Sequence, residues 1–255
     1  MAPRAPLVLT PLPGIPEVAA GDDLAALVVA GLVQAGIALA DGDVIVLAQK
    51  VVSKAEGRAV RLAEVTPGAK ARELAAIAHK DPRVVELILA ETDEVLRCRQ
   101  GVIVVQDRRG FVMANAGIDA SNVTIDGETV LLLPADPDAS AGRLRAALET
   151  ASGARIGVLV IDSFGRAWRL GTTGTAIGIA GLPGLIDMRG TPDMNGRPLQ
   201  TTELGAADEL AAAASLAMGQ AAERTPVVHV RGFPYKLREG SAAELVRPKA
   251  MDLFR

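Results

Sequence analysis

The feature that most constrains this sequence is a short apolar run that stops at a carboxylate. Residues Ile156 to Ile161, reading IGVLVI, have the length and branched composition of a buried β-strand. The run ends at Asp162 and Ser163. A carboxylate and a hydroxyl held on a rigid strand end are oxygen ligands suited to a hard cation. The stretch therefore predicts a buried strand that delivers polar groups to one edge of a sheet.

Basic and glycine-rich residues follow this strand. After Arg166 and Arg169, the Gly/Thr-rich segment Gly171 to Gly174 is expected to be a loop whose amides and hydroxyls face phosphate oxygens. Arg166 suits a bidentate phosphate clamp, and Lys54 suits a point charge on phosphate. The alternative is a strand followed by a capped turn with solvated arginines, because no Walker-type or GxGxxG spacing is present. Both interpretations stay open at this level.

Composition limits both the core and the partners. Of the 255 residues, 49% are hydrophobic but only 2% are aromatic, so small and aliphatic side chains must build the interior. A net charge of −3 gives no reason to expect broad contact with nucleic acid or an anionic membrane. The single Cys98 rules out an internal disulfide, and two histidines are too few for a zinc site. The length allows one large domain or two lobes.

The sequence does not predict secretion or membrane insertion. The apolar run from Leu7 to Leu9 is interrupted by prolines and is too short for the core of a signal peptide. Leu24 to Ala40 falls short of a membrane span and is predicted to contain a buried helix, capped by Asp22 or Asp23. We therefore expect a cytoplasmic protein.

Apolar runs and cap signals predict the other regular elements. The predicted strands are Val44 to Ala48, Gly101 to Gln106, Phe111 to Asn115 as its hairpin partner, Leu131 to Leu133, Ala176 to Gly181 and Pro226 to Val230. The predicted helices are Thr66 to His79, Asp81 to Ala90, Gly142 to Glu149 and Ala206 to Gln220. Gln49 to Arg58, with two lysines four residues apart, is interpreted either as a solvated loop or as a cationic segment at a strand end.

Two more acidic positions lie in turn-rich segments. Asp119 and Asn122 fall in AGIDASNV, and Glu203 precedes the Ala-rich helix. The structural alternatives are an Asx-turn for the first two and a capping carboxylate for Glu203. If Asp119, Asp162 and Glu203 gathered in one cleft, they would repel one another unless divalent cations neutralised them. The group therefore favours a Mg or Mn site, in which the cations bridge the phosphates of a nucleotide.

A series of motifs, taken in order, resembles one known family. LPGIPEV, GDD, QKVVSKAEGR, AGIDASNV, LLPADPDASA, IDSFGRAWR, TELGAADE and VVHVRGF are similar to the F420-0:gamma-glutamyl ligases, which use GTP to add glutamate to coenzyme F420. The resemblance runs from about Leu12 to Phe233, and its specificity lies in the joint order of the motifs. It implies an α+β fold of mixed sheets with flanking helices, assembled as a homodimer.

The resemblance also assigns site residues. Those implied for GTP are Ile15, Pro16, Glu17, Val18, Gln49, Lys54, Asn122, Thr201, Thr202, Leu204, Gly205, Ala206, Ala207 and Asp208. Those implied as metal ligands are Asp119, Asp162, Ser163 and Glu203. Lys54 and Arg166 are the expected catalytic cations. Ser163 stands where members often carry threonine, which preserves the hydroxyl.

The implied chemistry is amide-bond formation through an acyl phosphate, with GTP as co-substrate and the F420 precursor and L-glutamate as partners. Two divalent cations, Mg or Mn, are expected, and a monovalent cation is a further candidate. Residues 1–240 are expected to form the ligase domain, as one unit or two lobes, and 241–255 a mobile tail. The nitroreductase-like domain of some relatives is not expected here. The rival functions are another metal-dependent GTPase or phosphotransferase and a catalytically silent nucleotide-binding dimer.

Overall fold

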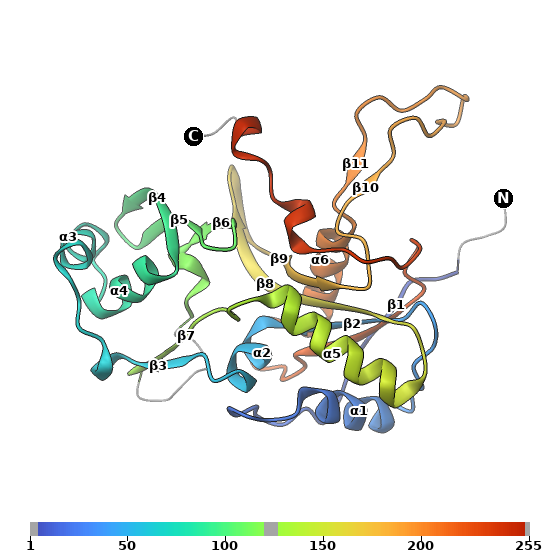
Figure 1. Ribbon diagram of the computed structural model, residues 1–255, viewed down its shortest axis with the longest axis horizontal. Helices are drawn as coiled ribbons and strands as arrows, with labels where there is room; N and C mark the ends of the chain where they lie inside the picture. The colour runs from blue at the N-terminus through green and yellow to red at the C-terminus, as the bar shows by residue number, and fades with distance from the viewer. Residues whose placement is uncertain (1–4, 120–126, 253–255) are drawn as a thin grey trace.

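A computed structural model describes residues 5–119 and 127–252. Its centre is a five-stranded sheet in the order β1-β12-β2-β8-β9 (Figure 1). These strands are β1 (Val8–Pro11), β2 (Val44–Ala48), β8 (Gly157–Arg166), β9 (Arg169–Ala180) and β12 (Val227–Arg231). The pair β2 and β8 is parallel, and the other neighbours are antiparallel. The carboxyl end of β2 therefore lies beside Ile161 of β8, and β8 continues beyond it to Arg166.

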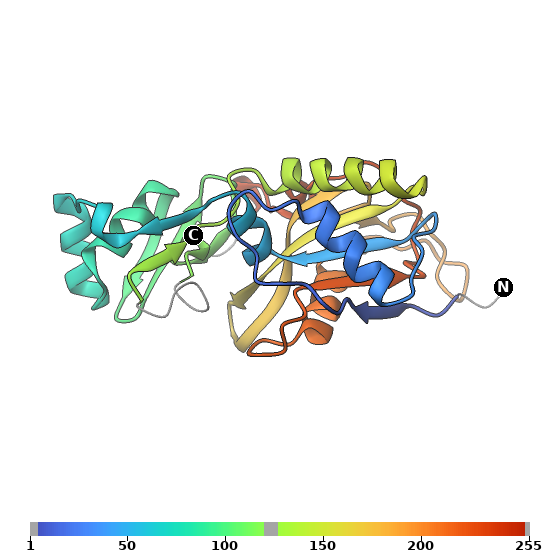
Figure 2. The same ribbon diagram turned by 90° about the horizontal axis from the view of Figure 1, so that it is seen from below.

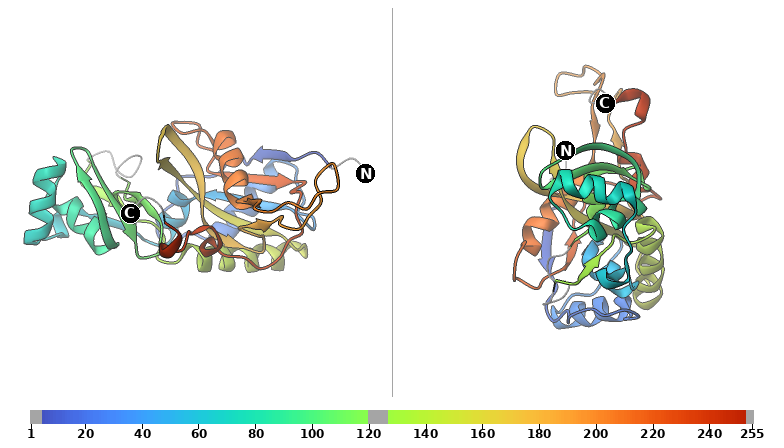
Figure 3. Two further views of the ribbon diagram at one scale, coloured as in Figure 1. Left: turned by 90° about the horizontal axis from the view of Figure 1, so that it is seen from above. Right: turned by 90° about the vertical axis from the view of Figure 1, so that its left-hand side faces the viewer.

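Helices on both faces explain why the central strands are aliphatic. Helix α5 (Pro137–Ser152) and helix α6 (Ala206–Met218) cover opposite faces, and α1 (Leu24–Gln34) lies on the side of α5 (Figure 3). Residues Val44 to Leu47 have no exposed surface, which matches the uninterrupted apolar pattern of a strand buried on both sides. Asp23 caps α1 as predicted, with its side chain accepting from the amides of residues 25 and 26. The described residues contain no helix long and apolar enough to cross a membrane.

A small lobe with its own core lies at one end of the elongated molecule (Figure 2). It contains β3 (Ala59–Arg61), α3 (Ala69–Ala78), α4 (Pro82–Ala90), β4 (Thr92–Arg99), β5 (Val102–Asp107), β6 (Val112–Ala114) and β7 (Thr129–Leu131), with 3-10 turns at Leu62–Glu64 and Asn115–Gly117. The predicted hairpin is confirmed, since β5 pairs with β6. Strand β4 was not predicted because its residues alternate irregularly between polar and apolar. The mixed sheets and flanking helices confirm the α+β class.

The hairpin of β8 and β9 corrects two predictions. The strand does not end at Asp162 but continues to Arg166, and the expected loop from Gly171 to Gly174 lies inside β9. Gly174 is opposite Ser163 in the register. Its lack of a side chain serves close packing, because a Cβ there would collide with α6. Glycine in this segment therefore provides helix contact rather than a phosphate-binding loop.

The C-terminal segment up to residue 252 is held against both lobes, in contrast to the expected mobile tail. It contains 3-10 turns at Ala242–Leu245 and Lys249–Met251. The Ala242 amide donates to the Asp138 carboxylate, and Lys249 pairs with Glu94 of the small lobe at 2.7 Å. A separate excursion, closed by β10 (Ile186–Asp187) and β11 (Glu203–Leu204), projects from the large lobe (Figure 1).

Candidate functional site

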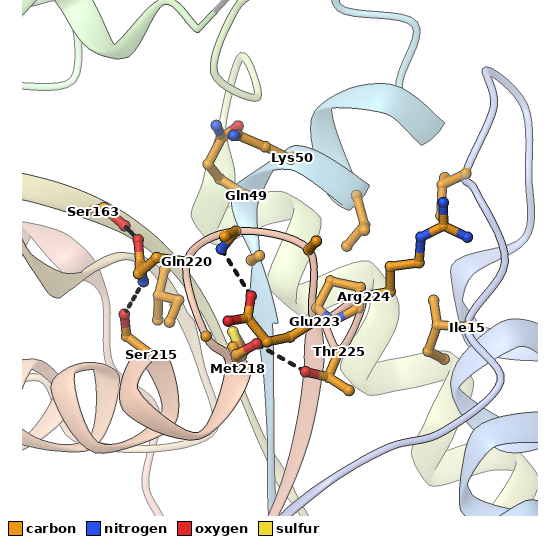
Figure 4. A pocket seen from close by; sticks show the side chains of 18 of the residues that line it. Ile15, Gln49, Lys50, Ser163, Ser215, Met218, Gln220, Glu223, Arg224 and Thr225 are labelled. Carbon is orange, nitrogen blue, oxygen red and sulfur yellow. Dashed lines mark hydrogen bonds between the residues drawn. The ribbon is translucent and has the colours of Figure 1, made fainter. Parts of the chain in front are cut away.

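A pocket of about 750 Å³ lies where β2 ends, beside residues 161–163 in the middle of β8 (Figure 4). Polar groups and ligands gather at the carboxyl ends of parallel strands, because the loops that follow them diverge there. Its walls are residues 15–18 before α1, 48–51 and 54 at the end of β2, 161–163 of β8, and 215 with 218–226 around the end of α6. The amide of Ala48 donates to the carbonyl of Pro226 at 2.9 Å, which ties the last of these segments to β2.

Helix α2 (Gln49–Ala55) forms one wall. Of the two open interpretations of this segment, the solvated loop is wrong, and its lysines do follow a strand end. Its inner residues Gln49, Val51 and Val52 are buried. The segment is too short for the helical spacing of its apolar residues to be recognised in the sequence. The Gln49 side chain is 1% exposed, and its Oε1 accepts from the Ser53 hydroxyl at 2.9 Å. Its Nε2 has no hydrogen-bond partner in the described part of the chain. A buried amide donor left unpaired is costly, which marks Gln49 as a candidate ligand contact.

Two carboxylates meet beside this helix. Asp119 reaches the site because it bridges to Leu131 of β7, and its Oδ2 pairs with Lys50 Nζ at 2.7 Å. Burial, together with the charge of Asp119, raises the pKa of Asp162 to about 6, against the opposing effects of the Ser163 amide and Lys50. Asp162 thus carries a charge that the surrounding protein only partly compensates. Such a group gains stability from any cation that reaches it.

The loop between α6 and β12, residues 219–226, was not predicted as part of the site. The Thr225 hydroxyl donates to the Met218 carbonyl at 2.8 Å, and the Ala221 amide donates to Glu223 at 2.8 Å, so the loop closes on itself. Arg224 adopts a left-handed backbone conformation with φ of 56° and extends toward the side of the pocket where Ile15 lies (Figure 4). The only available signal was the GQAAERTP composition of a turn, which does not specify a ligand.

The cations of the pocket differ from those expected. Lys54 lines the pocket and lies 3.5 Å from Glu17, a long ion-pair distance. Arg166 is not in the pocket: it lies at the exposed tip of the β8 and β9 hairpin and donates to the Leu170 carbonyl at 3.3 Å. The expected phosphate clamp at Arg166 therefore stays a prediction that this pocket does not include. Lys50 and Arg224 line the pocket instead.

The predicted segment Thr201 to Asp208 also lies outside this pocket. Thr201, Thr202, Leu204, Gly205, Ala206, Ala207 and Asp208 precede or begin α6, whereas the pocket contacts the last turn of this helix. A helix of 13 residues is about 20 Å long, so the two ends are well separated. Glu203 pairs with Arg189 at 3.2 Å in the β10 and β11 excursion rather than joining Asp119 and Asp162. The part of this region that lines the pocket is therefore residues 218–226, and the nucleotide contact of the expected segment stays a prediction.

The remaining expected residues do come together. Ile15, Pro16, Glu17, Val18, Gln49, Lys54, Asp162 and Ser163 all line the pocket. Asn122 lies outside the described residues. In the described ranges no group of three or more His, Cys, Asp or Glu side chains is arranged to hold a metal. The donor set suited to a hard cation is instead two carboxylates and a hydroxyl, Asp119, Asp162 and Ser163, which leaves coordination positions for ligand oxygens.

Comparison with known proteins gives a consistent result. Residues 14–232 match the family described as F420-0:Gamma-glutamyl ligase. The Coenzyme F420:L-glutamate ligase of Methanothermobacter thermautotrophicus is 46% identical over 244 residues, covering 95% of this chain and 96% of the relative. Proteins of the same name from Methanopyrus kandleri and Archaeoglobus fulgidus are 43% and 41% identical, over 98% and 96% of this chain and 98% and 95% of their own lengths.

Proposed function

The chain belongs to the F420-0:gamma-glutamyl ligase family and is an amide-bond-forming ligase, and from this premise we propose that it adds L-glutamate to the coenzyme F420 precursor with GTP as energy source. The reaction takes place in the pocket at the end of β2. The names of the relatives supply the acceptor and the amino acid. The use of GTP, the cation and the mechanism are our inference from the resemblance and the pocket.

The observation that carries this proposal is the meeting of cationic and acidic groups around one unpaired buried donor. Lys50, Lys54 and Arg224 face the same space as Asp162, and the Gln49 amide nitrogen has no partner in the described residues. Phosphate oxygens suit the cations, and a base, ribose or phosphate acceptor suits the amide. A volume of about 750 Å³ is within the range of small-molecule sites.

Divalent Mg or Mn fits the donor chemistry of this site in part. Asp119, Asp162 and Ser163 would hold the cation, and the raised pKa of Asp162 reflects a charge that the protein leaves undercompensated. When bound, the cation would neutralise the charge that builds up on the transferred phosphate. Glu203 is not part of the proposed set, because its partner is Arg189.

The proposed reaction has two steps. A carboxylate oxygen of the F420 precursor attacks the γ-phosphorus of GTP, so an acyl phosphate forms as the bond to GDP breaks. The amino nitrogen of L-glutamate then attacks the acyl carbon; the amide bond forms, inorganic phosphate leaves with the electron pair, and the nitrogen releases its proton. Lys50, Lys54 and Arg224 would hold the phosphates in place, and α2 with the 218–226 loop would limit the access of water.

We also propose that the protein is a homodimer. At the tip of the β8 and β9 hairpin, Trp168 and Leu170 are 88% and 98% exposed. Large apolar side chains exposed together often mark an interaction surface. A second copy of the chain would cover these side chains. Sedimentation velocity should give a dimer for the wild type and a smaller species for the Trp168→Ser, Leu170→Ser double variant; a monomeric wild type would overturn this part.

Mass spectrometry of a complete reaction tests the function. The protein is incubated with GTP, Mn or Mg, L-glutamate and the unglutamylated F420 precursor, and each component is omitted in turn. We expect mass increments of one glutamate residue that require both GTP and the cation. GTP hydrolysis without any increment would favour the phosphotransferase alternative, and GTP binding without turnover would favour a silent nucleotide-binding dimer.

A further inference from the structure

A chain of directional hydrogen bonds connects the edge of the pocket with the interior of α6. The Ser163 hydroxyl donates to Gln220 Oε1 at 2.9 Å, and Gln220 Nε2 donates to the Ser215 hydroxyl oxygen at 2.8 Å (Figure 4). Ser163 is exposed, whereas Ser215 is 8% exposed on the inner face of the helix. These hydrogen bonds thus connect Ser163, a candidate ligand group, with Ser215, which is held in a helix.

The packing of α6 on β9 puts Ser215 in this place. Gly174, opposite Ser163 in the β8 and β9 register, lies under the helix, and a Cβ at 174 would collide with the Ala211 carbonyl and the Ser215 Cβ. Only a residue without a side chain lets the helix approach so closely. Ser215 is therefore held beside the strand pair that carries Ser163, and its position does not depend on a mobile loop.

The direction of each bond decides what Ser163 offers to the pocket. A side-chain amide has one accepting end and one donating end, and nothing intrinsic decides which end faces a given neighbour. In the structure Ser215 accepts from Nε2, and the oxygen of Gln220 faces Ser163. The Ser163 hydroxyl then commits its only proton to Gln220, and its lone pairs remain available. A hydroxyl free to rotate could equally present its proton, which would repel a cation.

We propose that Ser215 is a positioning residue that acts through Gln220 to hold the Ser163 oxygen ready for a divalent cation. The inference rests on the proposed function for the nature of what binds, and it adds a residue of the pocket wall that acts through Gln220 and is not itself a cation ligand. Its role is orientation of an amide, and so it differs from the charge-based roles of Asp119 and Asp162. Loss of Ser215 should weaken cation binding without removing a ligand.

Mn titration of the full chain, followed by electron paramagnetic resonance of the free ion, tests this role. We expect Ser215→Ala to raise the apparent Kd for Mn about 5- to 10-fold, with kcat at saturating Mn within about twofold of wild type. Ser140→Ala is the matched control: it also removes a buried serine hydroxyl from a helix, where Ser140 donates to Glu56, but it lies away from the pocket. This control should lose stability without any change in Mn affinity.

The same serine substitution, made in a Gln220→Glu protein, separates the orientation of the amide from the packing of the serine. In Gln220→Glu the carboxylate accepts from both hydroxyls, so no amide needs to be oriented, and adding Ser215→Ala should change the Kd less than about twofold. If Ser215→Ala fails to fold, Ser215→Cys, of similar volume but with a weak acceptor, should show the same rise in Kd. Equal Mn affinity in wild type and a folded Ser215 variant would overturn the inference while leaving the ligase proposal intact. Failure of wild type to bind Mn would overturn both.

Discussion

Two enclosed carboxylates, Asp43 just before β2 and Asp162 in β8 near the far end of β2, differ in how far the protein compensates their charge. At the start of β2, Asp43 accepts from His229 Nε2 at 2.9 Å, from Arg231 at 2.7 and 2.9 Å, and from the Ala40 amide at 2.9 Å. Burial alone would raise the pKa of Asp43, but these hydrogen bonds outweigh it and lower the pKa. At the other end, burial prevails and the pKa of Asp162 rises to about 6.

The contrast shows what distinguishes a structural acid from a functional one. Burial is common to both, so the outcome depends on how many donors the protein itself supplies. Asp43 is 1% exposed and fully engaged within the chain, and it ties β2 to β12 through His229 and Arg231. Asp162 has a like charge, Asp119, as a neighbour, and the positive charge of Lys50 offsets the effect of burial only in part. The same sheet is therefore stabilised at one end and prepared for a ligand at the other.

Asp162→Asn should give the largest effect. Removal of a ligand carboxylate from the proposed cation site should lower ligase turnover by about 10³-fold, the equivalent of roughly 4 kcal/mol in the barrier. The same change removes an undercompensated charge, so the apo-protein should melt about 2–4 °C higher. Steady-state assays and calorimetry measure the two quantities. Unchanged activity would contradict the assignment of this end of the sheet.

Asp43→Asn should reverse that pattern. It leaves His229 and Arg231 without their shared carboxylate, and the expected loss is about 3 kcal/mol of unfolding free energy, because one partner of a buried charge cluster is removed. Denaturant unfolding gives the value. Mn affinity of the remaining folded protein should match wild type, and a selective loss of Mn binding at full stability would contradict the division between the two ends.

The two carboxylates should also respond to pH in opposite senses. The folded-state pKa of Asp162 lies above the unfolded value near 3.8, so its destabilising effect is absent below about pH 4 and grows as pH rises to about 6. The lowered pKa of Asp43 contributes stability above the unfolded pKa, and this is lost as pH falls through the folded value. Mn affinity should fall about tenfold from pH 7.5 to pH 5 in wild type, because Asp162 becomes protonated. A flat profile over this range would contradict the pKa assignment.

The smallest expected effect concerns two arginines. Arg166→Ala should change the KM for GTP by less than about twofold, because its side chain lies at the hairpin tip. Arg224→Ala should raise this KM about tenfold, since a guanidinium that lines the pocket can pair with phosphate. Both arginines are exposed, so the pair is matched in its effect on stability. A large effect at Arg166 alone would instead indicate that Arg166 contacts phosphate, for example in the pocket of a partner subunit.

Local pattern was sufficient for the parts of the molecule that are regular or strongly apolar. The runs at Val44–Ala48 and Ile156–Ile161 predicted two central strands, although not their parallel pairing, and Asp162 was identified because a polar pair follows the apolar run. Helix α2 was missed because seven residues hold too few turns for a helical period to be recognised. The apolar β8 run also gave no sign that the strand continues to Arg166.

The contents of the pocket were harder to predict, since they depend on which end of α6 faces β8. Residues 201–208 carry acids and hydroxyls and resemble a binding segment, whereas 219–226 is a plain turn sequence. Gly174 lets the later turns of α6 approach β9, a contact between segments far apart in the sequence. Glu203 and Arg166 also lie outside the pocket, which their sequence neighbours did not indicate. The sequence showed which side chains could bind a ligand, but it did not show where these side chains lie in the fold.

Hydrogen exchange measured by mass spectrometry, with and without GTP and Mn, tests most directly whether the pocket at the carboxyl end of β2 is the binding site. We predict added protection in residues 15–18, 49–54 and 218–226, with residues 201–208 unchanged. Asp162→Asn should abolish the protection that depends on Mn. Protection confined to 201–208, with the pocket segments exchanging as in the free protein, would contradict the proposed site.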